Sequence, residues 1–153
     1  MNCKVSIIMG VFNSEKTIRK CIDSILNQTY KNIEFVICDD NSIDNTYSIL
    51  KQYQQKNSNI VVIKNNENKG LAYSLNRCLK NCSKDSKYIA RMDGDDICIE
   101  TRIEKQVSFL NTHDGYDVVG TARYLDDETG SMKITNVKEI PQKEDLKFGS
   151  PFA

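Results

Sequence analysis

Two patterns of apolar and polar residues alternate along the chain. Apolar runs of strand length occur at residues 4–12, 32–40, 60–64 and 87–93. The first is nearly continuous, as expected for a strand buried on both faces of a sheet. Segments whose apolar residues recur every three or four positions, typical of helices, follow these runs and begin near residues 13–15, 41–44, 71 and 101. This alternation predicts an α/β fold with a mostly parallel central sheet flanked by helices.

The regular alternation ends after about residue 113. The segment YDVVGTARYL (116–125) predicts the start of a further strand, and Glu128-Thr129-Gly130-Ser131 predicts a hairpin turn in an otherwise polar remainder. We therefore expect an α/β domain over residues 1–125 and the incomplete start of a second region over residues 126–153.

The charge of the chain is balanced. Its 153 residues include 21 Lys and Arg and 21 Asp and Glu, so nucleic acid is not predicted as a partner. No apolar run approaches the roughly 18 residues that a membrane-spanning helix needs, and the N-terminus has no signal-peptide pattern. The sequence therefore predicts a cytoplasmic protein with no transmembrane segment in this chain.

The six cysteines are scattered and include no C-x-x-C pair. Reduced thiols are therefore predicted, and neither a disulfide framework nor a zinc site is. The single histidine, His113, has no second histidine with which to share a metal, and it is expected at a helix end or on the surface.

Polar residues follow three of the four predicted strands. Phe12-Asn13 follows the first strand, Asp39-Asp40 the second, and Asp93-Gly94-Asp95-Asp96 the fourth. Ligands of such sheets bind outside the carboxyl ends of the strands, where the strand order reverses. The sequence thus predicts a ligand site at this edge of the sheet.

The acidic cluster after the fourth strand has two readings. Two or three carboxylates suit a divalent cation that keeps positions for water and substrate phosphates, and Gly94 leaves room for a diphosphate to approach the backbone. The cluster is also compatible with a solvated turn that caps the next helix. Asp39-Asp40 has the same two readings, because turn and cap chemistry explains it as well. Asp39 is the better candidate for the site, where its carboxylate would need a donor such as a base N–H or a ribose hydroxyl.

Other phosphate-binding classes fit poorly. The chain has neither G-x-G-x-x-G after its first strand nor G-x-x-x-x-G-K-[ST] anywhere. A phosphate-accepting receiver domain would place an acidic pair after the first strand and an acceptor Asp after the third, where this chain has GVFN and IKNN.

Several segments together resemble the inverting family 2 glycosyltransferases, which have the GT-A fold and use nucleotide-diphosphate sugars. The resemblance runs from about Val5 to Thr121 and is carried by VSIIMGVFNSEKTIRKCIDSILNQTYKNIEFVICDDNSIDNT, NENKGLAYSLNRCL and YIARMDGDDICIETRIEKQVSFL. It implies a Rossmann-like GT-A fold without the C-terminal acceptor part. Gly10 stands where many relatives have proline.

The resemblance also implies roles for individual residues. Residues after the first strand would wall the nucleotide base, Asp39 would hydrogen-bond it, and the segment at Lys69-Gly70 would lie near the base and diphosphate. Asp93 would face the ribose and Asp95 would coordinate Mn²⁺ or Mg²⁺. The implied substrate-binding residues are Val11, Phe12, Asn13, Asp39, Lys69, Gly70, Asp93 and Gly94, and the implied metal ligands are Asp95 and Asp93.

The function implied is transfer of a sugar, hexosyl or N-acetylhexosaminyl, from a nucleotide-diphosphate sugar such as a UDP-sugar. The acceptor would be a hydroxyl of a saccharide or lipid-linked saccharide in polysaccharide biosynthesis, and the enzyme would be cytoplasmic or peripheral at the inner face of the membrane. An inverting transferase needs a general base, which we expect beyond Ala153 because no acid near residues 117–128 matches the family's base motif. Two alternatives stay open: a non-catalytic nucleotide-sugar-binding fragment and a nucleotidylyltransferase. A nucleotidylyltransferase is expected to have a glycine-rich loop with Arg or Lys after the first strand, which GVFNSEKT matches poorly.

Overall fold

The computed structural model describes residues 3–122, 124–126 and 132–134. The chain divides into two compact units, Met1–Lys105 and Gln106–Ala153. Its elements, in chain order, are β1 (Lys4–Val11), α1 (Ile18–Leu26), β2 (Ile33–Asp39), α2 (Thr46–Lys56), β3 (Ile60–Lys64), α3 (Leu71–Asn81), β4 (Ser86–Arg91), α4 (Arg102–Thr112), β5 (Tyr124–Asp126) and β6 (Met132–Ile134).

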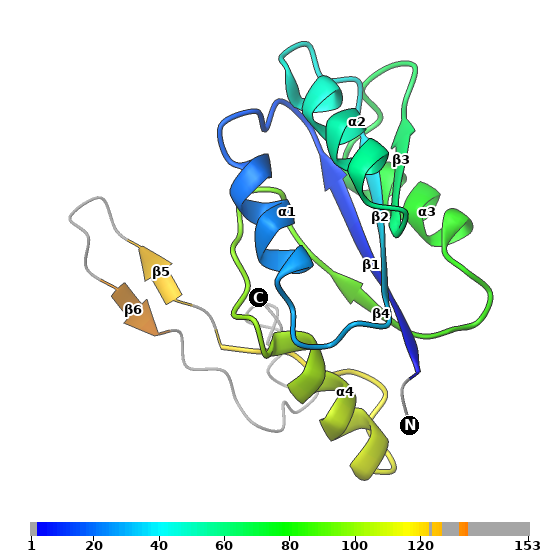
Figure 1. Cartoon of the computed structure of the whole chain (residues 1–153), viewed down its shortest axis with the longest axis vertical. Coiled ribbons are helices and arrows are strands. Elements are labelled where there is room, and N and C mark those ends of the chain that lie inside the picture. Colours follow the sequence, from blue (N-terminus) through cyan, green and yellow to red (C-terminus); the bar gives the residue numbers. More distant parts are fainter. Residues whose placement is uncertain (1–2, 123, 127–131, 135–153) are drawn as a thin grey trace, which may run out of the picture. The chain divides into compact units, whose positions relative to one another are not determined.

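The first unit is built on a parallel sheet with the strand order β3-β2-β1-β4 (Figure 1). The chain runs outward from β1 through β2 to β3 and then returns through α3 to β4, on the other side of β1. The strand order therefore reverses between β1 and β4. The structure confirms the predicted α/β fold with a parallel sheet.

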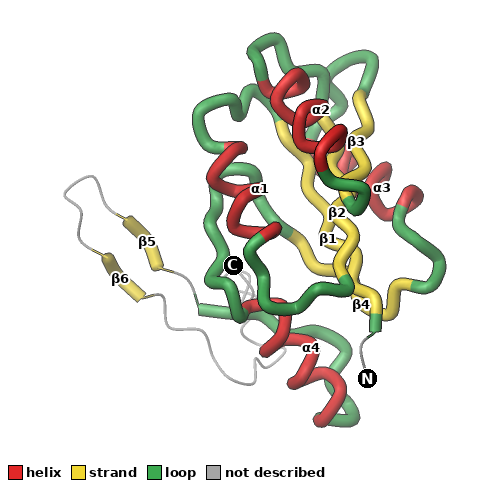
Figure 2. Tube along the Cα trace, in the orientation of Figure 1, coloured by secondary structure: helices red, strands yellow, loops and turns green. Residues whose placement is uncertain are grey.

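Helices cover both faces of this sheet, with α1 and α2 on one face and α3 on the other (Figure 2). Ile8 of β1 and Val36 of β2 form a buried cluster with Cys78 of α3. The next residue of β1, Met9, points to the opposite face, where its Sδ lies 3.7 Å from Cys21 Sγ of α1. Burial on both faces explains the continuous apolar runs of the central strands β1 and β2, whereas the edge strands β3 and β4 are partly exposed.

Two predicted elements differ from the structure. Helix α1 begins at Ile18, later than expected, because the preceding residues form a loop whose backbone donors bond to another loop. The strand expected over 116–125 is wrong for most of its length: the described residues 116–122 form no strand, β5 begins at Tyr124, and Val118 is 62% exposed. The short strands β5 and β6 pair antiparallel with each other, and the predicted turn at 128–131 lies outside the described residues.

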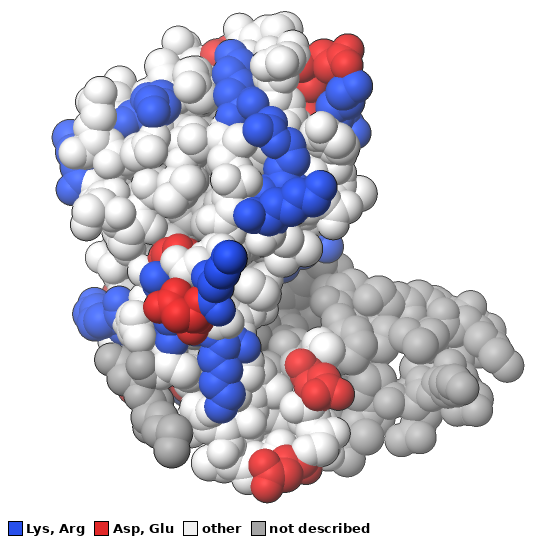
Figure 3. Space-filling model, turned by 90° about the vertical axis from the view of Figure 1, so that its right-hand side faces the viewer, with Lys and Arg blue, Asp and Glu red and all other residues white. Residues whose placement is uncertain are grey.

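The remaining expectations concern cysteines, His113 and surface charge. All six cysteines are free, and His113 directly follows α4, exposed and stacked on Phe109. Within the part of the chain that the structure describes, no helix has the length and apolarity to cross a membrane. Lys and Arg gather in a band on the face that carries β3 and α3, with acidic side chains beside them (Figure 3), as the balanced composition suggests.

Candidate functional site

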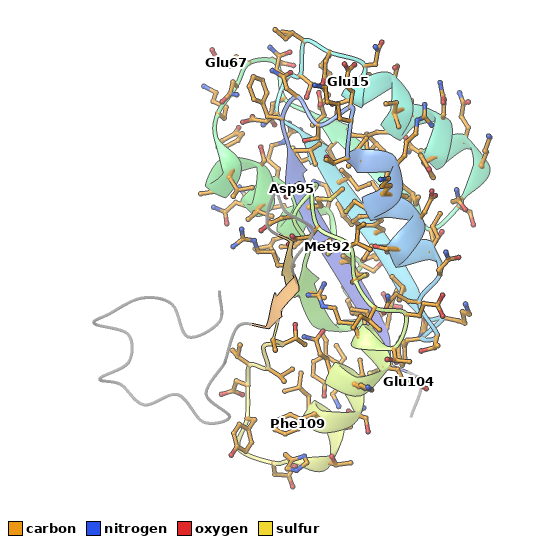
Figure 4. All side chains as sticks on the ribbon, turned by 90° about the vertical axis from the view of Figure 1, so that its left-hand side faces the viewer. Glu15, Glu67, Met92, Asp95, Glu104 and Phe109 are labelled. Atoms are coloured by element: carbon orange, nitrogen blue, oxygen red, sulfur yellow. The ribbon has the colours of Figure 1, made fainter. Side chains whose placement is uncertain are left out.

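An open cavity of about 620 Å³ lies at the carboxyl ends of β1 and β4, the point where the strand order reverses. This is the position at which α/β sheets of this type bind their ligands. Figure 4 shows Asp95 and Glu15 toward this end of the sheet and Glu104 toward the other. The lining residues are Gly10, Val11, Phe12, Asn13, Ser14, Glu15, Lys16, Thr17, Asp44, Leu71, Asp93, Gly94 and Asp95.

The loops that follow β1 and β2 are held together by hydrogen bonds. Asn13 donates its backbone N–H to Ser42 Oγ (2.9 Å), and its Oδ1 accepts the backbone N–H of Ile43 (3.0 Å). Ser14 donates its backbone N–H to Thr46 Oγ1 (2.7 Å). Asn13 has a φ of 51°, in the left-handed region where asparagine is enriched. These bonds fix the wall of the cavity that the first loop forms.

Two carboxylates complete the link between these loops. Asp44 accepts the backbone N–H groups of Glu15 (3.1 Å) and Thr46 (2.9 Å), and Glu15 Oε2 accepts the backbone and side-chain N–H groups of Asn45 (3.0 and 2.9 Å). Burial by itself raises the pKa of Asp44, but the hydrogen bonds from Thr46 and Glu15 outweigh it and hold that pKa below its ordinary value. The carboxylates of Asp44 and Glu15 therefore hold the two loops together.

The acidic cluster after β4 forms a tight turn, in which Asp96 donates its backbone N–H to the carbonyl of Asp93 (3.2 Å). The Asp93 carboxylate is bound by Arg91, whose Nη2 lies 2.9 Å from Oδ1 and 3.0 Å from Oδ2. Asp95 is exposed and has no hydrogen bond or ion pair with another described residue. The turn ends well before α4 begins at Arg102, so it does not cap that helix.

Gly94 is buried inside this turn. A Cβ at this position would lie 2.7 Å from Val11 Cγ1, a contact that the stiff, β-branched valine cannot relieve by rotating. The glycine is thus required for the turn to pack against the end of β1. This packing is a different reason for Gly94 from the predicted clearance for a diphosphate.

Asp39 and Asp40 are consecutive at the end of β2 and point to opposite faces of the sheet. Asp39 is fully buried; its Oδ2 accepts the backbone N–H of Ser42 (3.2 Å), and its Oδ1 has no partner. Asp40 accepts the backbone N–H groups of Lys69 (2.9 Å) and Gly70 (2.7 Å). The first carboxylate retains unused acceptor capacity, whereas the second orders the loop before α3.

Asp40 belongs to a buried polar network. Asn65 Nδ2 donates to Asp40 Oδ1 (2.5 Å), and Arg77 Nη1 donates to Asn65 Oδ1 (2.5 Å). Burial raises the pKa of Asp40, but the hydrogen bonds from the Lys69 backbone and the Asn65 amide outweigh burial and lower that pKa. Sequence reasoning gave Asp40 no role, because its partners are separated from it by 25 or more positions.

The structure brings only some of the predicted residues together. Val11, Phe12, Asn13, Asp93, Gly94 and Asp95 line the cavity, whereas Asp39, Lys69 and Gly70 do not. Lys16 lines it as well and was not foreseen; it is exposed and has no hydrogen bond or ion pair with another described residue. A lysine five residues past the end of β1, in the loop at the predicted site edge, was the available signal. The other lining residues that were missed are Gly10, Ser14, Glu15, Thr17, Asp44 and Leu71.

The donor set limits how a metal could be held here. The described residues contain no group of three or more His, Cys, Asp or Glu side chains that could hold a metal ion. Asp95 offers a free carboxylate, while Asp93 is engaged by Arg91. Mg²⁺ is commonly held by one or two carboxylates together with substrate phosphates. The residues therefore fit a cation shared with a diphosphate, and they do not fit one held by these side chains alone.

A parallel α/β sheet with a cavity at its switch point is the architecture of the Rossmann-like folds, whose ligands bind at that point. The family model "Glycosyl transferase family 2" matches residues 6–150. The chain belongs to glycosyl transferase family 2.

Individual relatives agree with this assignment. EpsE of Bacillus subtilis (strain 168), named as a glycosyltransferase, is 47% identical over 150 residues, which are 97% of this chain and 53% of EpsE. The Escherichia coli UDP-Glc:alpha-D-GlcNAc-diphosphoundecaprenol beta-1,3-glucosyltransferase WfaP is 44% identical over 108 residues, 71% of this chain and 41% of WfaP. The chain thus spans about half the length of the curated relatives it matches.

Solved structures share the fold. S. aureus TarS 1-349 in complex with UDP-GlcNAc has a TM-score of 0.66 and 26% identity, covering 76% of this chain and 37% of that one. The mannosyltransferase PcManGT from Pyrobaculum calidifontis, in complex with GDP-Man and Mn²⁺, also has a TM-score of 0.66, with 22% identity over 76% of this chain and 34% of that one. These likenesses confirm the Rossmann-like GT-A fold for the N-terminal part of such an enzyme.

Proposed function

We propose that this chain is the nucleotide-sugar-binding part of an inverting glycosyltransferase that uses Mn²⁺ or Mg²⁺. The observation that carries the proposal is the cavity at the carboxyl ends of β1 and β4, lined by Phe12, Asn13 and the exposed carboxylate of Asp95. The donor is a UDP-sugar carrying a hexosyl or N-acetylhexosaminyl group, supported by the name of WfaP and by the UDP-GlcNAc complex of TarS.

Different residues of the site bind different parts of the nucleotide-sugar donor. Phe12 and Asn13 wall the base, with the segment at Lys69 beyond it. Asp39 accepts a hydrogen bond from a base N–H through its unpartnered Oδ1. Because Asp39 is fully buried, side chains above it must shift for the base to reach it. Asp93 faces the ribose, and its charge is already balanced by Arg91.

Asp95 holds the cation against the diphosphate. When bound, Mn²⁺ or Mg²⁺ supplies positive charge that stabilises the diphosphate as it leaves. An acceptor hydroxyl forms the new bond to C1 of the sugar on the side opposite the breaking C1–O bond to the diphosphate, which inverts the anomeric centre. The hydroxyl proton passes to a general base, which we place in an acceptor-binding part outside the described residues.

The name of one relative supports a proposal for the acceptor and the location. WfaP is named for an acceptor attached to diphosphoundecaprenol, so we propose a lipid-linked saccharide as acceptor and polysaccharide biosynthesis as the process. Such an enzyme works in the cytoplasm or peripherally at the inner face of the membrane.

One observation favours a second candidate, in which these residues bind the nucleotide sugar without transferring it. Of the four carboxylates that line the cavity, those of Glu15, Asp44 and Asp93 already accept hydrogen bonds from loops or from a guanidinium. Only Asp95 is without a partner among the described residues. Release of UDP from UDP-glucose or UDP-GlcNAc in the presence of a saccharide acceptor, catalysed by the chain alone, would argue against this candidate.

Calorimetry tests the main proposal. We expect the chain to bind UDP, and Mn²⁺ to strengthen binding about tenfold or more. Asp95→Ala should abolish the strengthening, because it removes the carboxylate that fixes the cation. The control Asp85→Ala changes an exposed acid just before the same strand, at its opposite end, and should behave as wild type. UDP binding that is equal with and without Mn²⁺ and unchanged in Asp95→Ala would contradict the proposal.

A further inference from the structure

Helix α1 and the residues that flank it present a row of polar side chains to the segment that follows β4. Cys21 and Ser24 lie on α1, Thr17 immediately precedes it, and Gln28 follows its last residue, Leu26, by two positions. Their spacing of four, three and four positions places them along one side of α1. The facing segment, residues 92–101, contains no helix or strand. It lacks the regular hydrogen bonds of a ladder, so side chains of other elements decide where it lies.

The first two members of this row hold the acidic turn itself. Thr17 Oγ1 donates to the carbonyl of Gly94 (2.9 Å), and the Cys21 thiol donates to the carbonyl of Asp93 (3.3 Å). Both contacts reach the backbone and do not involve the carboxylate of Asp95.

The other two members hold the chain beyond the turn. Ser24 Oγ accepts the backbone N–H of Cys98 (3.2 Å). Gln28 Nε2 donates to the carbonyl of Ile99 (2.9 Å), and its Oε1 accepts the backbone N–H of Ile103 (3.0 Å) in the first turn of α4. The turn is thus anchored on both sides by α1.

Gln28 is the strongest of these anchors. Only 1% of its surface is exposed, and its amide also donates to the Ser24 carbonyl (3.1 Å) and to Cys98 Sγ (3.2 Å). A buried amide with all of its hydrogen bonds made is rigid. Gln28 does not line the cavity, so it acts on the site only through the segment it holds.

We propose that Gln28 is a positioning residue for the metal-binding turn, fixing the Asp95 carboxylate against the diphosphate of the donor. The inference rests on the proposed function of Asp95. Partners that orient a metal ligand without touching the metal typically affect metal affinity by about 10–100-fold when they are removed. The walls of the base pocket belong to the loops after β1 and β2, which Gln28 does not contact. The residue therefore affects the metal-dependent part of nucleotide binding and spares the rest.

The test compares UDP affinity with and without Mn²⁺ by calorimetry. Gln28→Met keeps the length of the side chain and removes its hydrogen bonds. We expect metal-free UDP affinity to stay within about twofold of wild type, and the gain on adding Mn²⁺ to fall about tenfold or more. Ser24→Ala removes the acceptor for the Cys98 N–H and should also reduce the gain in UDP affinity on adding Mn²⁺. It tests the inference if Gln28→Met does not fold. Hydrogen exchange should speed up at the backbone amides of Cys98 and Ile103, whose acceptors these substitutions remove.

A control separates positioning from general stability. Val36→Ala leaves a cavity in the core on the α3 face of the sheet and lowers stability. It does not change the segment after β4, so the gain in UDP affinity on adding Mn²⁺ should remain that of wild type. An unchanged Mn²⁺ gain in folded Gln28→Met or Ser24→Ala, or an equal loss in Val36→Ala, would overturn the inference. Failure of the wild-type chain to bind UDP would instead overturn the proposed function.

Discussion

The guanidinium of Arg91 binds the carboxylate of Asp93 through two nitrogens, with Nε 3.1 Å and Nη2 2.9 Å from Oδ1. The pair leaves Asp95 as the free carboxylate of the turn. We expect Arg91→Gln to raise the affinity for Mn²⁺ alone a few-fold, because it removes a positive charge and frees a second oxygen ligand. Titration of Mn²⁺ followed by electron paramagnetic resonance, without nucleotide, measures this affinity. Arg19→Gln, on the exposed side of α1, is the control, and a lower affinity in Arg91→Gln would count against this role.

Asp39 carries an unpartnered, buried oxygen, which is costly to the free protein and useful only if a ligand supplies a donor. Asp39→Asn should therefore weaken UDP binding about 10–100-fold, in line with a lost hydrogen bond to a charged group. The melting temperature should stay equal or rise, because the variant no longer buries an uncompensated charge. Calorimetry and thermal unfolding measure the two quantities. Normal UDP binding in Asp39→Asn would exclude Asp39 from the base site.

Asp40 makes stability depend on pH. Its folded-state pKa is lowered by the hydrogen bonds it accepts, so its stabilisation is complete above the unfolded pKa of about 3.9 and is lost as the pH falls through the folded pKa. We expect Asp40→Asn to lower the unfolding free energy at pH 7 by about 1–3 kcal/mol. The difference from wild type should shrink below about pH 4. Urea unfolding at a series of pH values measures it, with Asp85→Asn as an exposed control. A difference that is constant with pH would contradict the assignment.

Lys16 is an exposed cation on the wall of the cavity and is positioned to attract a diphosphate. Lys16→Met keeps the apolar stem and should weaken UDP binding a few-fold at low salt, with a smaller effect at high salt because ions screen exposed charges. Lys20→Met, one turn along α1 and outside the cavity, should bind UDP as wild type does. If Lys16→Met and wild type bind UDP with equal affinity at low salt, Lys16 does not bind the diphosphate.

The central strands β1 and β2 could be predicted because burial on both faces produces continuous apolar runs. The edge strand β3 lies at residues 60–64, as predicted from its apolar residues, although it is only partly buried. The first turn of α1 could not be predicted, since Asn13 and Ser14 use their backbone donors on a loop about 30 positions away. The apolar residues near Val118 suggested a strand, yet a strand needs a partner, and none is present there among the described residues.

Part of the candidate site could likewise be predicted from the sequence, and part could not. Its acidic turn and strand-end residues could be recognised because parallel strands bring their carboxyl ends to one edge. Gln28 could not be recognised, because an amide just past the end of a helix gives no sign that its partners lie at Ile99 and Ile103. That Asp39 and Asp40 point to opposite faces of the sheet could be predicted from strand geometry. The hydrogen-bond partners of Asp40 could not, because only the fold brings them close to it.

We propose that a divalent cation and a uridine diphosphate share the cavity at the carboxyl ends of β1 and β4. The most direct measurement is a nuclear magnetic resonance spectrum of the ¹⁵N-labelled chain with UDP, to which Mn²⁺ is added in small amounts. Paramagnetic Mn²⁺ broadens the amide signals nearest to it, so we predict that signals of Asp95, Asp96 and the Asn13–Thr17 loop disappear first. Signals of Lys4 and Ser86, at the amino ends of β1 and β4, should persist. Broadening that is uniform, or centred at the amino ends of the strands, would contradict the account.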